Sequence, residues 1–232
     1  MKALGAAAIA AAFVGATVSS TAHATLVFDG DLGTLPTAQG WTFLGSYNAP
    51  MSVSGGQLTM GPTTVGGTTY WAHDLVEPVL FSTETMYIEA TVRLSGADFG
   101  NYSGYRRAGF TLFLIDDAGK WIVADIGDNR ISIGNDDNRT SDPSMVFNMT
   151  DAFHTLRLEA GPAGGRLLVD GVPLLTLGLG SGQTPGATGR WGEATQLANA
   201  NQIEVRRVEM VPTPGALALM GLGGLVATRR RR

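Results

Sequence analysis

Cysteine is absent from this chain of 232 residues, and histidine occurs only three times. The lack of cysteine excludes disulfide bonds, thiolate catalysis and zinc sites built on sulfur. Three histidines leave little for a histidine metal site. Charge is also scarce, since 16% of the residues are charged whereas globular chains typically reach about 25%. Few catalytic chemistries are therefore open to this protein.

Basic residues are especially few in the body of the chain. Lys2 and Arg229 to Arg232 account for five of the 16 basic residues, whereas all 20 acidic residues lie between Asp29 and Glu209. The body thus holds 11 basic and 20 acidic residues, a net charge of −9. Such a surface repels phosphate backbones, so we expect no nucleic-acid partner.

Glycine, by contrast, is plentiful. It makes up 32 of the 232 residues and shows no collagen-like period. The chain is also 44% hydrophobic, which is enough to build a core. Composition therefore predicts one packed domain that is rich in turns.

The first 24 residues have the pattern of a signal peptide. Lys2 precedes an apolar run from Ala3 to Val18, and Ala22-His23-Ala24 is the small-x-small pattern that signal peptidase reads. The alternative is a buried alanine-rich helix. We expect export, with a mature chain that begins at Thr25.

The C-terminus combines a proline motif, an apolar segment and a block of arginines. Val211-Pro212-Thr213-Pro214 is followed by an apolar run from Ala216 to Ala227 and then by Arg229 to Arg232. A helix over residues 215–228 would span about 21 Å, which is short for a bilayer core. The positive-inside rule would hold the arginines in the cytoplasm. We therefore expect a tail that enters the inner membrane from outside.

Residues 211–232 resemble the PEP-CTERM sorting signal of Gram-negative bacteria, which has these three parts in this order. The resemblance implies an exosortase-type processing enzyme, transient anchoring in the inner membrane, and a final place at the cell surface or in the extracellular matrix. Thr213 stands where the family has a glutamate, so the motif is a variant. An anchor that stays uncut is the alternative.

Between Thr25 and Met210 the sequence alternates with the period of two that is typical of half-buried strands. The clearest case is residues 86–94, where apolar and polar side chains alternate. Further strands are expected at Leu26 to Asp29, Trp41 to Leu44, Gln57 to Met60, Thr68 to Asp74, Arg107 to Asp116, Trp121 to Ile126, Arg130 to Ile133, Phe153 to Ala160, Arg166 to Val169, Pro173 to Leu177 and Gln202 to Met210. Asp170-Gly171 and Asp117-Ala118-Gly119 predict hairpin turns. The pattern predicts an all-β sandwich.

The succession of these elements carries a second resemblance, over residues 25–210. Gly-Gly-Gln-Leu-Thr-Met at 55–60 precedes the long strand, and the hairpin from Phe110 to Ile126 follows it. Then come Phe153-His154-Thr155-Leu156-Arg157-Leu158-Glu159, Leu168-Val169-Asp170-Gly171 and the closing strand. This order resembles the concanavalin A-like lectin and glucanase superfamily, including laminin-G-like domains. It implies an antiparallel jelly-roll sandwich whose first and last strands lie together.

A glycosidase needs two carboxyl groups about 5 to 9.5 Å apart across the scissile bond. In the glucanase branch of the superfamily they lie on one strand in the string Glu-x-Asp-x-x-Glu, which this sequence lacks. The tyrosine, histidine and arginine signatures of sandwich-type polysaccharide lyases are also missing. We therefore expect no enzyme, and a hydrolase or lyase with an unrecognised site is the lesser alternative.

Carbohydrate binding needs aromatic rings to stack on sugars and a few fixed polar groups. Alternation places Trp121 and Asp125 on one face of a strand, and Trp71 and His73 form a similar pair. Arg107, Tyr105 and Trp191 are expected to line a groove from adjoining loops. Tryptophans that merely cover the core are the alternative. We predict a non-catalytic protein that binds extracellular or cell-surface polysaccharide; the rival is a structural or adhesive surface or biofilm-matrix protein.

Acidic residues crowd into a short stretch after residue 124. Asp125, Asp128, Asp136 and Asp137 could supply oxygen ligands to calcium. The spacing matches no standard calcium loop, and turn capping or solvated ion pairs are the alternative. Calcium is thus the one cofactor that the sequence suggests.

Overall fold

The computed structural model describes residues 25–45, 50–61, 68–75, 78–95, 100–102, 105–107, 109–135, 142–193 and 202–213. The predicted signal peptide and the apolar segment and arginines of the tail lie outside these ranges. Within them the chain forms β-strands and two single-turn 3-10 helices, η1 (Gly30–Leu32) and η2 (Pro36–Gln39). Neither of these helices has the length or the apolar character needed to cross a bilayer.

One sheet has eight strands, all paired antiparallel. Its order is β15-β14-β13-β6-β17-β4-β3, and β1 also pairs with β17. The strands are β1 (Leu26–Asp29), β3 (Met51–Ser54), β4 (Gln57–Met60), β6 (Thr85–Ser95), β13 (His154–Gly161), β14 (Gly164–Val169), β15 (Val172–Leu177) and β17 (Gln202–Thr213).

The other large sheet has seven antiparallel strands in the order β12-β11-β10-β9-β16-β5-β2. They are β2 (Thr42–Gly45), β5 (Thr69–Asp74), β9 (Phe110–Ile115), β10 (Trp121–Ile126), β11 (Arg130–Gly134), β12 (Ser144–Val146) and β16 (Thr188–Glu193). Two short strands, β7 (Gly100–Tyr102) and β8 (Tyr105–Arg107), pair with each other apart from these sheets.

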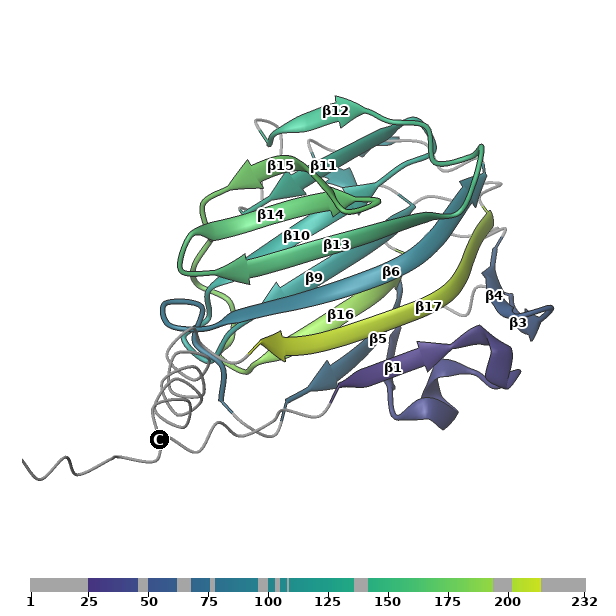
Figure 1. Ribbon diagram of the computed structural model, residues 1–232, viewed down its shortest axis with the longest axis horizontal. Helices are drawn as coiled ribbons and strands as arrows, with labels where there is room; N and C mark the ends of the chain where they lie inside the picture. Colours follow the sequence, from purple (N-terminus) through teal and green to yellow (C-terminus); the bar gives the residue numbers. More distant parts are fainter. Residues whose placement is uncertain are drawn as a thin grey trace, which may run out of the picture.

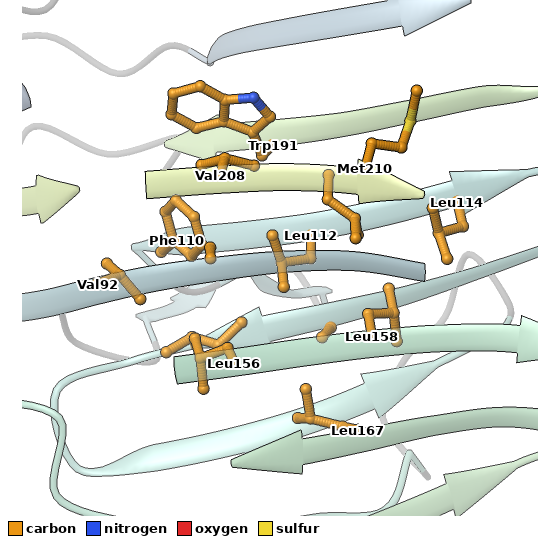
Figure 2. Close-up of a cluster of buried hydrophobic side chains, with 14 of the residues drawn as sticks. Val92, Phe110, Leu112, Leu114, Leu156, Leu158, Leu167, Trp191, Val208 and Met210 are labelled. Carbon is orange, nitrogen blue, oxygen red and sulfur yellow. The ribbon is translucent and has the colours of Figure 1, made fainter. Parts of the chain in front are cut away.

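The two large sheets stack face to face, with their strands running in similar directions (Figure 1). The alternation expected in β6 is present, because its even-numbered residues from Met86 to Leu94 are fully buried. Apolar side chains from both sheets meet in the core (Figure 2): Val92, Leu156, Leu158, Leu167, Val208 and Met210 from one sheet, and Phe110, Leu112, Leu114 and Trp191 from the other. The fold is the predicted antiparallel jelly-roll sandwich.

The first and last strands of the sandwich lie together, as predicted. Leu26 of β1 pairs with Met210 of β17, and Asp29 with Arg207. This pairing covers part of one edge of β17, whose other edge follows β6 along its whole length. An edge that would otherwise invite aggregation is thereby occupied.

The closing strand is longer than the sequence predicted. It continues through Val211, Pro212 and Thr213, which pair with Tyr87, Met86 and Thr85 of β6. The predicted strand from Gln202 to Met210 therefore ends three residues too early, and Val211, Pro212 and Thr213 of the proline motif belong to this strand. Pro214 lies outside the described residues.

Both predicted hairpin turns are present. Asp170 and Gly171 have φ values of 50° and 78°, as the primed turn between β14 and β15 requires. In the turn between β9 and β10, Asp116 Oδ1 accepts hydrogen bonds from the backbone N–H groups of Ala118 and Lys120. Asp116 is buried, and its other carboxylate oxygen accepts a hydrogen bond from the Phe81 N–H.

Candidate functional site

Each sheet has an outer face, which we define as the face turned away from the core. On the outer face of the eight-stranded sheet, arginines pair with acids on neighbouring strands. The pairs between strands are Arg157 with Glu89, Arg166 with Glu159 and Arg93 with Glu204. Arg207 pairs with Glu209 along the same strand, β17. Arg157 also lies over the Tyr87 ring, 4.3 Å from its centroid. This face neutralises its own charges, and its polar groups are already engaged.

The outer face of the seven-stranded sheet is organised differently, as the strand register shows. Arg190 of β16 lies beside Phe113 of β9, which lies beside Val123 of β10. One row away, Thr111 of β9 lies beside Asp125 of β10. In the opposite direction, Ile115 of β9 lies beside Trp121 of β10. We call these seven residues the central patch.

The central patch contains a second apolar cluster, separate from the core. Ile115, Trp121 and Val123 are buried, and Phe113 packs against them while remaining partly exposed. The rings of Phe113 and Trp121 are tilted, with their centroids 5.5 Å apart. Phe113 is therefore the aromatic side chain of the patch that retains surface for a ligand.

A buried carboxylate lies next to this apolar cluster. Asp125 is 2% exposed, and its Oδ1 accepts a hydrogen bond of 3.0 Å from the Thr111 hydroxyl. Burying a carboxylate is costly unless other groups compensate its charge. Thr111 supplies one such group, so Asp125 is a fixed and enclosed part of the patch rather than a solubilising group.

Arg190 supplies the positive charge of the patch. Its guanidinium carbon lies 5.7 Å from the centroid of the Phe113 ring. Its Nε is enclosed and has no hydrogen-bond partner among the described residues. The patch thus combines an aromatic ring, a buried acid and a cation within three neighbouring strands.

The structure brings two predicted binding residues, Trp121 and Asp125, together on this outer face. Trp121, however, is only 3% exposed. Its backbone exchanges hydrogen bonds with Gly180, and a Cβ on that glycine would lie 2.7 Å from the indole Nε1. The predicted role of Trp121 as an open stacking platform is therefore wrong. Its enclosed ring packs against the ring of Phe113.

The other two predicted tryptophans lie in the core. Trp71 and Trp191 are 1% and 0% exposed, and their rings stack with centroids 4.6 Å apart. His73 shares the inward side of β5 with Trp71, and its ring meets the edge of Trp41 at 6.2 Å. A ring enclosed on both faces cannot stack on a sugar. The prediction that Trp71 and Trp191 bind carbohydrate is therefore wrong, and both residues belong to the core, as the alternative had it. With Trp71 enclosed, the predicted pair of Trp71 and His73 is no sugar platform.

The remaining predicted site residues lie at the margins of the described chain. Tyr105 and Arg107 belong to β8, and their side chains lie outside what the structure describes. Of the predicted calcium ligands, Asp136 and Asp137 lie outside the described residues. Asp128 Oδ1 is buried and has no hydrogen-bond partner in the described part of the chain. Among the described residues, no three His, Cys, Asp or Glu side chains are grouped to hold a metal ion.

A hollow of about 400 Å³ lies at the turn between β13 and β14. Its lining is mostly backbone and small side chains, together with the ion-paired Glu159 and Arg166. It offers no aromatic ring to a sugar, because none of its lining residues is aromatic.

Sequence reasoning missed Phe113 and Arg190 as site residues. Phe113 lies in a strand so apolar that both of its faces look buried. Arg190 lies in a strand that was not predicted. The available signal for Arg190 was its place next to Trp191, since a tryptophan in the core directs its neighbour outward.

No protein-family model and no curated protein sequence matches the chain. Solved structures do share its fold. The Crh5 transglycosylase in complex with NAG is 12% identical with a TM-score of 0.53, covering 84% of this chain and 86% of that chain. A sialidase is also 12% identical, with a TM-score of 0.52, covering 84% of this chain but 19% of that one. The metal-free carbohydrate recognition domain of Emp46p is 15% identical with a TM-score of 0.46, covering 77% and 91%. This chain therefore has a sandwich fold that also occurs in a transglycosylase and in part of a sialidase.

Proposed function

We propose that this protein is an exported, non-catalytic carbohydrate-binding sandwich, and that polysaccharide binds to the central patch on the seven-stranded sheet. One observation carries the proposal: a partly exposed aromatic ring, Phe113, lies there beside a cation, Arg190. The sandwich shared with a transglycosylase is compatible with this role but does not by itself establish it.

The chemistry of the patch suits a sugar. Phe113 offers an apolar surface on which the C–H face of a sugar ring can stack. Arg190 holds donor groups beside that surface, and such groups orient a sugar. Asp125 and Thr111 are 2% and 3% exposed, so they shape the patch and do not contact the sugar. The outer face of the other sheet is less suitable, because its arginines and glutamates already bind one another.

The test is a glycan array probed with wild-type protein, Phe113→Ala and a matched control, Tyr87→Ala. Tyr87 is also a partly buried aromatic residue, but it lies on the opposite outer face. We expect Phe113→Ala to lose the signal and Tyr87→Ala to keep it. Equal loss in the two variants would contradict the proposed location.

The rival function, a structural or adhesive surface or biofilm-matrix protein, predicts no glycan signal from any of these proteins. The non-catalytic part of the proposal is tested by the release of reducing sugar from a polysaccharide panel. Release that persists through purification would identify a hydrolase, and new unsaturated ends would identify a lyase. Either result would overturn the non-catalytic role.

Calcium is proposed as a ligand of the acidic stretch from Asp125 to Asp137. The buried and unpartnered oxygen of Asp128 supports an ion there, because an enclosed carboxylate oxygen needs a cation or a donor. We expect millimolar calcium to raise the melting temperature and a chelator to reverse the rise. No shift in wild type would dismiss calcium, and an unchanged shift in Asp128→Asn would dismiss Asp128 as a ligand.

Export and sorting complete the proposal. The signal-peptide pattern and the tail support secretion by a Gram-negative cell, transient anchoring in the inner membrane and processing by an exosortase-type enzyme. Signal peptidase is the other expected partner. In this view the sandwich ends at the cell surface or in the extracellular matrix, where polysaccharide is abundant.

A further inference from the structure

We propose that the polysaccharide bound at the central patch is acidic, and that the carboxylate of a uronic acid unit pairs with Arg190. This inference rests on the proposed carbohydrate-binding function and names the class of glycan. It follows from the state of the Arg190 side chain, from the geometry of the patch and from a comparison with the other arginines.

Among the described residues Arg190 has no counter-charge, unlike Arg93, Arg157 and Arg166 on the other outer face. Arg93, Arg157 and Arg166 each bind a glutamate on an adjacent strand. Within the described part of the chain Arg190 forms no ion pair, and its Nε donor has no acceptor. The sheet thus positions a guanidinium group at the centre of a face without providing the anion that it needs.

The partial burial of Arg190 makes the missing anion significant. An enclosed donor without an acceptor costs free energy that an exposed one does not. Contact with Phe113 recovers part of that cost through the attraction between a cation and an aromatic face. A ligand carboxylate would supply the counter-charge that the guanidinium lacks, because guanidinium donors match the two oxygens of a carboxylate.

The register places the cation directly beside the aromatic ring, and the buried acid one row away on the far strand. Arg190, Phe113 and Asp125 lie on the consecutive strands β16, β9 and β10. Strands are spaced about 4.8 Å apart and residues about 3.4 Å along a strand, so the two charged residues, two strands and two residues apart, are separated by roughly 12 Å. The uronate would lie over Arg190 and its neighbouring sugar over Phe113, because Asp125 is buried and offers no surface to a ligand.

The acidic body of the protein limits how the anion is recognised. A net charge of −9 between Asp29 and Glu209 repels polyanions at long range. Attraction must therefore come from the single close contact with Arg190. Acidic polysaccharides in which uronate alternates with a neutral sugar should bind better than those in which every unit is charged.

The experiment compares alginate, polygalacturonate and hyaluronan, each with its carboxyl-reduced form, in a direct binding assay at about 0.15 M salt. For wild-type protein we expect at least one native polymer to bind roughly 10-fold or more tightly than its reduced form, a ratio typical of one charge-assisted contact. Arg190→Gln should bind the two forms equally. Arg190→Lys should restore only part of the preference, because lysine keeps the charge without the fork.

The matched control is Arg206→Gln. Arg206 also lies over a phenylalanine ring, 3.8 Å from the Phe153 centroid, but it belongs to β17 in the other sheet. This variant should keep the wild-type preference. Native and reduced polymers that bind wild type equally well, with loss in Phe113→Ala, would overturn the acidic ligand while leaving the proposed function standing. An absence of binding to every acidic and neutral polymer would overturn both.

Discussion

At the scale of single residues, the four tryptophans show that residue type alone does not reveal a binding site. Trp41, Trp71 and Trp191 form one aromatic cluster in the core, with Trp41 meeting Trp191 edge-on at 5.7 Å. Trp121 lies on the other side of the seven-stranded sheet. The partly exposed Phe113, rather than any tryptophan, provides the aromatic surface.

This difference leads to a stability prediction. Trp191→Ala should lower the free energy of unfolding by about 3–5 kcal/mol, because it removes a fully buried aromatic ring. Phe113→Ala should cost less, since its ring is only partly buried. Chemical denaturation of the two variants measures the difference, and a larger loss for Phe113→Ala would show that its role is structural.

His154 is the residue with the most distinctive electrostatic setting. Its Nδ1 lies 2.7 Å from Asp170 and its Nε2 lies 3.0 Å from Asp151. The edge of its ring also packs on Phe147. Burial alone would lower the pKa of His154, but the hydrogen bonds and charges of the two aspartates raise it above the usual 6.5. Burial would raise the pKa of Asp170, but its hydrogen bonds and the charge of His154 together outweigh burial, so the pKa of Asp170 is lowered.

The stability of the folded protein should depend on pH through these two pKa shifts. The contribution of His154 is complete below pH 6.5 and is lost as the pH rises through its raised folded-state pKa. The contribution of Asp170 is complete above pH 3.8 and is lost as the pH falls through its lowered pKa. His154→Gln should therefore lower the melting temperature most between these values and least at alkaline pH. A melting difference that grows toward alkaline pH would contradict this account.

At the scale of elements, the sequence predicted most strands of the two large sheets but not β3, β12 or β16, nor the short strand β7. Strands β1, β4 and β10 have the predicted bounds. Strand β16 was missed because its residues Gly189 and Gly192 interrupt the pattern. The structure supplies the reason: a Cβ at Gly189 would lie 2.1 Å from Met210 Sδ across the core, and one at Gly192 would lie 2.0 Å from the Thr69 carbonyl oxygen. Tertiary contacts, which a sequence does not display, require both glycines.

The two glycines should respond differently to substitution. At Gly192 the added methyl group meets backbone, and its φ of 149° is strained for other residues. At Gly189 it meets a flexible methionine side chain that can move aside. Gly192→Ala should therefore destabilise the protein by more than Gly189→Ala, with overpacking costs of about 1–3 kcal/mol. Thermal melts compare them, and the reverse order would contradict this packing.

The candidate site could be predicted only in part. Alternation correctly placed Trp121 and Asp125 on one face, because the period of a strand is local information. Alternation could not show that Gly180 lies against the Trp121 indole. It also could not show which of the two apolar faces of β9, the strand of Phe113, packs into the core. Both depend on residues distant in the sequence.

At the scale of the whole molecule, the sandwich presents two unlike outer faces. The eight-stranded sheet pairs its arginines with glutamates, whereas the seven-stranded sheet leaves Arg190 without an acid among the described residues. This asymmetry is the reason for assigning ligand binding to the second face.

Export gives a prediction at the same scale. Protein produced from the full sequence in a Gram-negative host should begin at Thr25 after signal-peptide cleavage. Intact mass and N-terminal sequencing of the exported fraction measure this directly. A surface fraction that retains Met1 would contradict the proposed export route.

The most direct test of the central claim is a crystal structure of the sandwich soaked with an oligosaccharide from the best-binding polymer. The account predicts sugar density over Phe113, with a carboxylate against Arg190. Sugar found over Tyr87 and Arg157 on the other sheet would contradict it.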